Sequence, residues 1–73
     1  MIEINGKVEQ VHFYESNVGT PNKSIVVVLV DSRLPKTVAI EGDVRNALPV
    51  GSRVRMKIRK DGDVNVLAHV EYY

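Results

Sequence analysis

The chain has 73 residues, a formal net charge of +1 and no cysteine. This length is near the lower limit for a domain that folds alone, and no disulfide or thiolate–metal site can support its small core. The longest apolar run, Ile25–Val30, is too short to span a bilayer, and Glu3 and Lys7 interrupt any leader-like run at the start. We therefore expect one small cytoplasmic domain, 1–73, without membrane association, which self-association as a homodimer would help to stabilise.

The first predicted strand, Ile2–Glu15, changes its apolar face part of the way along. Val8 belongs to one alternation of apolar residues, whereas Val11 and Phe13 belong to the other. A strand changes the side that it turns to the core only at a bulge or kink, which we place at Glu9–Gln10. Long, bent first strands of this kind are typical of small closed barrels.

A polar loop and two more strands follow. The loop, Glu15–Lys23, is rich in Ser, Asn, Gly, Thr and Pro and is longer than a usual hairpin connection. The next strand, Ser24–Asp31, is apolar on both faces, which predicts a central strand that is covered on both sides. After a turn at 32–36, the short stretch Thr37–Glu41 predicts a third strand.

The segment 42–49, GDVRNALP, carries the only helical signal. Asp43 suits an N-cap, and Val44 and Leu48 fall on one face of the turn that follows. Pro49 ends this helix after one or two turns.

The last two strands form a hairpin whose register decides where the basic residues lie. The strand RVRMKIRK, Arg53–Lys60, alternates cations with apolar residues. A two-residue turn at Asp61–Gly62 would mix cations with valines on both faces. A three-residue connection, Lys60–Gly62, instead opposes Ile58 to Val64 and makes the inner face wholly apolar. The outer face then pairs Arg59 with Asp63, Lys57 with Asn65, Arg55 with Leu67, and Arg53 with His69.

This register leaves the middle of the basic strand without acids opposite it. The segment Val44–Lys60 holds six of the ten lysines and arginines and no acid. Arg55 and Lys57 face a leucine and an asparagine, so a localised anion-binding surface is one interpretation. The other is a solvated face whose charge is balanced by Glu3 and Glu9 of the first strand.

Three stretches, GKVEQV, IVVVLVD and GDVRNALPVGSRVRMKI, carry a resemblance to a known family. In them the chain resembles the small OB-fold single-stranded-DNA-binding proteins of bacteria and filamentous phages, as a pattern of elements that covers nearly the whole chain. We predict an all-β fold, a five-stranded antiparallel OB-fold-like barrel with one short helix between the third and fourth strands. An SH3-like barrel is the alternative, because GSRVRMKIRKDGDV would also suit its strand-turn-strand core.

The resemblance implies a ligand bound across the second and third strands, between the loops Glu15–Lys23 and Lys60–Asp63. The residues themselves point to the outer face of the fourth strand, where cations recur about every 6.8 Å as a ladder for phosphates. An exposed aromatic ring beside such a ladder would stack a base. The predicted nucleic-acid-binding residues are Arg53, Arg55, Lys57, Arg59, Tyr14, His12, Lys23 and Lys36.

Two functions stay open at this point. The first is non-catalytic binding of single-stranded nucleic acid, DNA rather than RNA, with little sequence specificity. The second is a structural or protein-interaction β-barrel module, which the near-zero net charge and the few aromatic residues favour. The sequence has no glycine-rich phosphate loop, nucleophile motif or set of metal ligands, so we expect neither catalysis nor a cofactor or metal.

Overall fold

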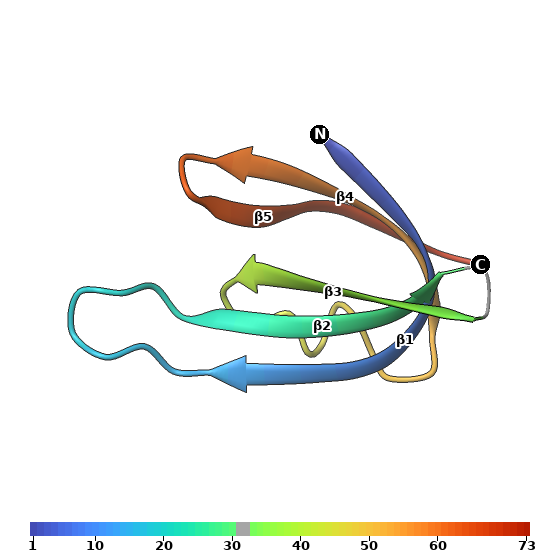
Figure 1. The fold of residues 1–73 in the computed structure, drawn as a ribbon, viewed down its shortest axis with the longest axis horizontal. Coiled ribbons are helices and arrows are strands. Elements are labelled where there is room, and N and C mark those ends of the chain that lie inside the picture. Colours follow the sequence, from blue (N-terminus) through green and yellow to red (C-terminus); the bar gives the residue numbers. More distant parts are fainter. Residues whose placement is uncertain (31–32) are drawn as a thin grey trace.

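The computed structural model describes residues 1–30 and 33–73. Five strands form one antiparallel sheet with the order β3-β2-β1-β4-β5 (Figure 1). The strands are β1 Ile2–Tyr14, β2 Lys23–Val30, β3 Leu34–Glu41, β4 Arg53–Asp61 and β5 Val64–Tyr72. The predicted all-β class with five antiparallel strands is therefore confirmed. Among the described residues, no helix has the length and apolar character needed to cross a membrane.

β1 is bent and pairs with strands in both halves of the sheet. Its residues 2–7 pair with β4, and its residues 7–14 pair with β2. The predicted bulge is confirmed, because the register with β2 shifts between Val8 and Gln10. Gly6 permits the close crossing of β1 and β2, since a Cβ at this position would lie 2.2 Å from a backbone carbonyl oxygen of β2.

The core lies on the concave side of the bent sheet and is built largely from β-branched residues, which suit a pleated surface. The buried apolar residues are Ile4, Val8, Val26, Val28, Ile40, Val44, Leu48, Val54, Met56 and Ile58. The other face of β2, with Ile25, Val27 and Leu29, is only half-buried. The prediction that the second strand is covered on both sides is therefore wrong.

The segment 42–49 forms turns and not the predicted helix. Only one helix-type hydrogen bond is present there, from the backbone N–H of Leu48 to the carbonyl of Val44 at 3.0 Å. The buried hydroxyl of Ser24 donates to the carbonyl of Gly42 at 2.7 Å and accepts from the N–H of Val44 at 3.2 Å. These bonds tie the segment to β2, and so short a stretch gains too few helical bonds to offset the cost of nucleation.

The turn between β4 and β5 has two residues. Asp61 pairs with Val64, which leaves Gly62 and Asp63 as the turn. Gly62 has a φ of 62°, the left-handed conformation that the first central position of such hairpin turns requires. The predicted three-residue connection, Lys60–Gly62, is therefore wrong.

A bulge in β5 then changes the face that each of its residues occupies. Ile58 pairs with Leu67 and Lys57 pairs with His69, so Ala68 has no partner on β4. Leu67 consequently faces inward and packs against the core. The predicted position of Leu67 on the outer face is wrong.

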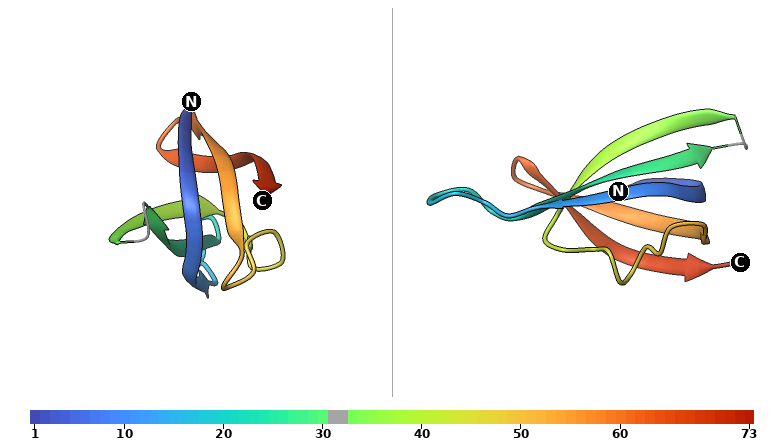
Figure 2. Two further views of the ribbon diagram at one scale, coloured as in Figure 1. Left: turned by 90° about the vertical axis from the view of Figure 1, so that its right-hand side faces the viewer. Right: turned by 90° about the horizontal axis from the view of Figure 1, so that it is seen from below.

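β3 and β5 are the two edges of the sheet. Near one end they are bridged by the side chain of Asn65, whose Nδ2 donates to the carbonyl of Ala39 at 3.0 Å. Toward the other end the strands fan apart (Figure 2). Within the described residues the sheet is thus strongly bent and open.

Candidate nucleic-acid interface

The side of β1, β4 and β5 that faces away from the core is rich in charge, and we call it the basic face. Its four β4 cations alternate with the buried residues Val54, Met56 and Ile58, so all four are exposed on the same side. The structure thus brings together four of the predicted site residues. The basic face consists of Glu3, Asn5 and Lys7 of β1, Arg53, Arg55, Lys57 and Arg59 of β4, and His69, Glu71 and Tyr73 at β5.

Acids lie opposite the middle of the basic strand. Glu3 of β1 pairs with Lys57, and Glu71 of β5 pairs with Arg55. The guanidinium of Arg55 lies between two carboxylates, with Nε 3.8 Å from Glu3 and Nη1 3.7 Å from Glu71. The prediction that no acid of the last strand lies opposite these cations is wrong for Arg55, because the β5 bulge places Glu71 there, whereas Lys57 faces His69. The acid opposite Lys57 is Glu3 of β1, one of the two balancing residues named by the alternative interpretation.

These ion pairs leave the cations accessible. Both contacts of Arg55 are near the outer limit for an ion pair, and about half of each side chain is exposed. Exposed pairs of this kind contribute only about 0–1 kcal/mol, so an incoming phosphate can compete for the guanidinium.

Two cations lie directly opposite each other at the end of β4, where Lys7 pairs with Arg53. Two like charges directly opposite each other in an antiparallel pair are destabilising. Neither side chain is within 4.0 Å of a carboxylate of the residues that the structure describes. This end of the basic face therefore has charge that is not compensated locally.

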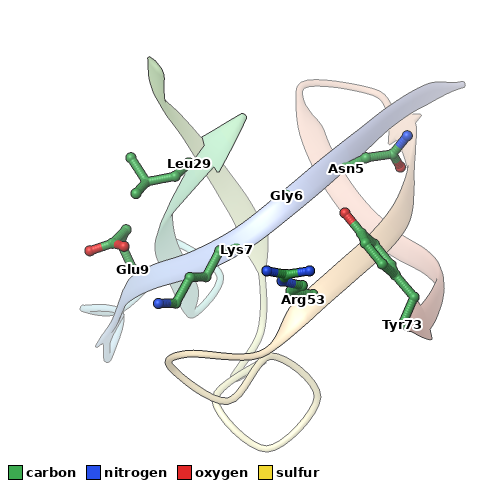
Figure 3. A pocket seen from close by; sticks show the side chains of 7 residues that line it. All are labelled: Asn5, Gly6, Lys7, Glu9, Leu29, Arg53 and Tyr73. Atoms are coloured by element: carbon green, nitrogen blue, oxygen red, sulfur yellow. The ribbon is translucent and has the colours of Figure 1, made fainter. Parts of the chain in front are cut away.

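An open hollow of about 460 Å³ lies beside this pair, and we call it the basic hollow (Figure 3). Lys7 and Arg53 line it together with Gly6, Glu9 and Tyr73. Figure 3 shows the Arg53 guanidinium between the Lys7 chain and the Tyr73 ring, with that ring rising toward β1. A nucleotide-sized ligand fits the volume, and the charged lining favours an anion.

Two rings stand among the charges of the basic face. Tyr73 is 64% exposed, and its ring centroid is 5.9 Å from Cζ of Arg55. The backbone N–H of Tyr73 donates to the carbonyl of Arg53 at 3.1 Å, which ties the main chain of Tyr73 to β4. His69 lies opposite Lys57, with its Nε2 3.1 Å from a Glu71 oxygen. Proteins that bind single-stranded nucleic acids commonly stack the bases on exposed aromatic rings that lie among cations.

A second hollow of about 470 Å³, which we call the acidic cleft, lies in the region where the resemblance implies a ligand. It lies between the β1–β2 loop, the end of β3 and the β4–β5 turn. Its lining includes three acids, Glu15, Glu41 and Asp63, and one cation, Lys23. A lining of this charge repels phosphates. The described residues contain no group of three or more His, Cys, Asp or Glu arranged to hold a metal ion.

Three of the four remaining predicted site residues lie away from the basic face. Tyr14 and Lys23 line the acidic cleft, and Tyr14 is 51% exposed. His12 lies on the same side of β1 as Tyr14 and contacts Gln10, with 3.1 Å between Nε2 and Oε1. Lys36, in contrast, lines a smaller hollow together with Glu3 and Asn5 of the basic face. The structure therefore separates Tyr14, His12 and Lys23 from the β4 cations and places Lys36 beside the basic face.

Arg45, which belongs to the acid-free segment, is occupied by a local acid. Its Nη2 and Nε donate to the Asp43 carboxylate at 2.6 and 2.9 Å. Its side chain also covers the ring of Phe13, with Cζ 4.9 Å from the centroid. Hydrogen bonds from Arg45 hold the pKa of Asp43 below its ordinary value, and the carboxylate raises the pKa of Arg45. Arg45 therefore packs over Phe13 and pairs with Asp43, and it is not part of the basic face.

The sequence analysis named neither Lys7 nor Tyr73 among the predicted site residues. Lys7 reaches the basic hollow through the pairing of β1 with β4, two strands far apart in the chain. The one signal in the sequence was that Lys7 shares its alternation with Glu3, which was considered as a balancing acid.

Comparison with known proteins leaves the site to be interpreted from its own residues. No family model, no curated protein and no solved structure matches the chain.

Proposed function

We propose that this protein binds single-stranded nucleic acid, DNA rather than RNA, along the basic face and with little sequence specificity. The observation that carries the proposal is the direct pairing of Lys7 with Arg53 beside the exposed ring of Tyr73. A cationic groove that follows the backbone and rings that stack bases are the two parts of sequence-tolerant single-strand binding. The proposal is one of binding alone, without catalysis.

The charge of the basic face supports this proposal. It has five cations, Lys7, Arg53, Arg55, Lys57 and Arg59, against the two acids Glu3 and Glu71, on a chain whose net charge is only +1. Localised positive charge steers a polyanion to one face even when the whole protein is nearly neutral.

We also propose an OB-type barrel as the framework of this function. Support comes from β1, which pairs with both β2 and β4, and from the Asn65–Ala39 hydrogen bond that bridges β5 to β3. A partly open five-stranded barrel has these neighbours. The acids of the acidic cleft, however, favour placing the nucleic acid on the basic face and not in the position that the resemblance implies.

Fluorescence anisotropy of labelled oligo-dT, titrated at several salt concentrations, tests the proposal. Three or four phosphate contacts predict a log–log slope of affinity against salt of about −2 to −3. Oligo-rU measured in parallel is expected to bind more weakly. Absence of oligo-dT binding at low salt would contradict the proposal and favour the structural or protein-interaction module. Light scattering over a range of concentrations tests the predicted homodimer.

A further inference from the structure

The basic hollow has an arrangement that the rest of the basic face does not share. Lys57 and Arg55 each lie opposite an acid, on β1 and β5 respectively. At Arg53 the opposite residue on β1 is Lys7, so two cations point to the same side of a paired position. An anion bound between Lys7 and Arg53 would relieve their repulsion, which otherwise destabilises the folded chain.

The floor of the basic hollow is backbone. A Cβ on Gly6 would point into β2, where it would meet the Leu29 carbonyl oxygen at 2.2 Å, and so away from the hollow. Gly6 therefore presents only main-chain atoms between Lys7 and Asn5 (Figure 3). A ligand can approach the strand closely here.

One wall of the basic hollow is aromatic. The side chains of Tyr73 and Arg53 both line the hollow, and the Tyr73 ring leans toward β1 (Figure 3). The backbone N–H of Tyr73 donates to the carbonyl of Arg53 at 3.1 Å, so the two residues occupy neighbouring positions on adjacent strands. A planar base can lie on the exposed ring while a phosphate attached to the same sugar reaches the two cations.

We propose that the basic hollow is a subsite for a single nucleotide unit, with the phosphate between Lys7 and Arg53 and the base on Tyr73. The ligand class is a nucleoside monophosphate, either free or as one unit of a strand. This inference rests on the proposed function and adds to it the one position where phosphate and base are bound together. Glu9 on the rim of the hollow limits the affinity, because it adds a negative charge near the phosphate.

Amide chemical shifts of the uniformly ¹⁵N-labelled chain, titrated at low salt with dTMP, thymidine and inorganic phosphate, test the subsite. We expect dTMP to shift Gly6, Lys7, Arg53 and Tyr73, and to bind roughly tenfold more tightly than either thymidine or phosphate. Equal binding of dTMP and phosphate, or dTMP shifts centred on Arg59 and Lys60, would overturn the proposal, because both indicate a diffuse cation effect.

Matched variants separate the subsite from general charge. Arg53→Gln and Tyr73→Leu are each expected to weaken dTMP binding about tenfold, whereas Arg59→Gln and Tyr14→Leu leave it unchanged. The dispersion of each variant's own spectrum shows that it is folded, since all four side chains are exposed. Equal losses in Arg53→Gln and Arg59→Gln would overturn the subsite.

Oligo-dT added to the same samples distinguishes the two proposals. Displacement of dTMP from the same amides by oligo-dT supports both. Oligo-dT binding along β4 without any dTMP binding overturns the subsite and leaves the proposed function standing. Binding of dTMP without binding of oligo-dT supports the subsite as a site for the free nucleotide and overturns the proposed function.

Discussion

The basic hollow and the acidic cleft are two hollows of nearly equal volume, about 460 and 470 Å³, with opposite charge. Lys7 and Arg53 dominate the first, whereas Glu15, Glu41 and Asp63 dominate the second. A net charge of +1 for the whole chain hides this separation. The two hollows therefore cannot be ranked as ligand sites by their volume. The sign of the local charge distinguishes them.

The difference between the two hollows also shows how far a resemblance in fold can predict a binding site. The strand order is compatible with a binding site between the β1–β2 loop and the β4–β5 turn, and a hollow is present there. Its acids nevertheless make it unsuited to a polyanion. Function depends on the residues that line a site, and those residues favour the basic face.

The largest effect that we expect comes from replacing the glycine beneath the basic hollow. Gly6→Ala places a Cβ 2.2 Å from a β2 carbonyl oxygen, so β1 and β2 must separate. We expect the free energy of unfolding to fall by about 3 kcal/mol, as measured by urea denaturation. Gly19→Ala, in the loop that borders the acidic cleft, is the matched control. Gly19 has a φ of 94° and nothing within 4 Å of its added Cβ, so only backbone conformation opposes the change, at about 1 kcal/mol. Equal losses in the two variants would contradict the assigned role of Gly6.

Removing the two cations of the basic hollow is expected to have the next largest effect. Lys7→Gln combined with Arg53→Gln should weaken oligo-dT binding about a hundredfold at low salt, because two charge-assisted contacts are lost. The log–log salt slope should become shallower by about 1.4. Lys23→Gln combined with Arg45→Gln changes the net charge by the same amount at positions away from the basic face, and should leave both quantities nearly unchanged. A similar loss in the control pair would mean that total charge and not position governs binding.

A smaller effect, of the opposite sign, is expected when an acid is neutralised. Glu9→Gln removes the acidic side chain that lines the basic hollow and should tighten oligo-dT binding about threefold, at the scale of a partly screened charge pair. Glu41→Gln makes the same chemical change in the acidic cleft and should have no measurable effect. If Glu41→Gln tightens binding as much as Glu9→Gln does, the nucleic acid contacts the acidic cleft after all.

The sequence could predict those features of the fold that depend on the alternation of apolar and polar residues within one strand. The switch from Val8 to Val11 within one strand is visible in the sequence, and the bulge lies between Val8 and Gln10. The bulge in β5 has no such sign, because Val64, Val66, Ala68 and Val70 alternate without a break. An uninterrupted alternation is compatible with a regular strand as well as with a bulged one, so the observed register of β5 was not predictable.

The composition of the candidate site was predictable only within one strand. The cations of β4 lie on one face because their spacing is local, and the structure keeps them together. The pairing of Lys7 with Arg53 depends on how β1 meets β4 across a long stretch of chain. That pairing is set by the core packing of both strands, which no local pattern encodes.

Arg45 belongs to neither hollow, and its pairing with Asp43 gives the smallest expected effect. Because hydrogen bonds from Arg45 lower the pKa of Asp43 in the folded chain, the ionised carboxylate stabilises the fold above the pKa of the unfolded state. This stabilisation is lost as the pH falls through the lower, folded pKa. Asp43→Asn should therefore reduce Tm slightly near neutral pH, and the difference from the unmodified chain should vanish once the pH has fallen below the lowered, folded pKa of Asp43. Thermal melts followed by circular dichroism between pH 2 and pH 7 measure this, and oligo-dT affinity at pH 7 should not change. A change in affinity would show that the segment around Arg45 contacts the nucleic acid, and would extend the interface beyond the basic face.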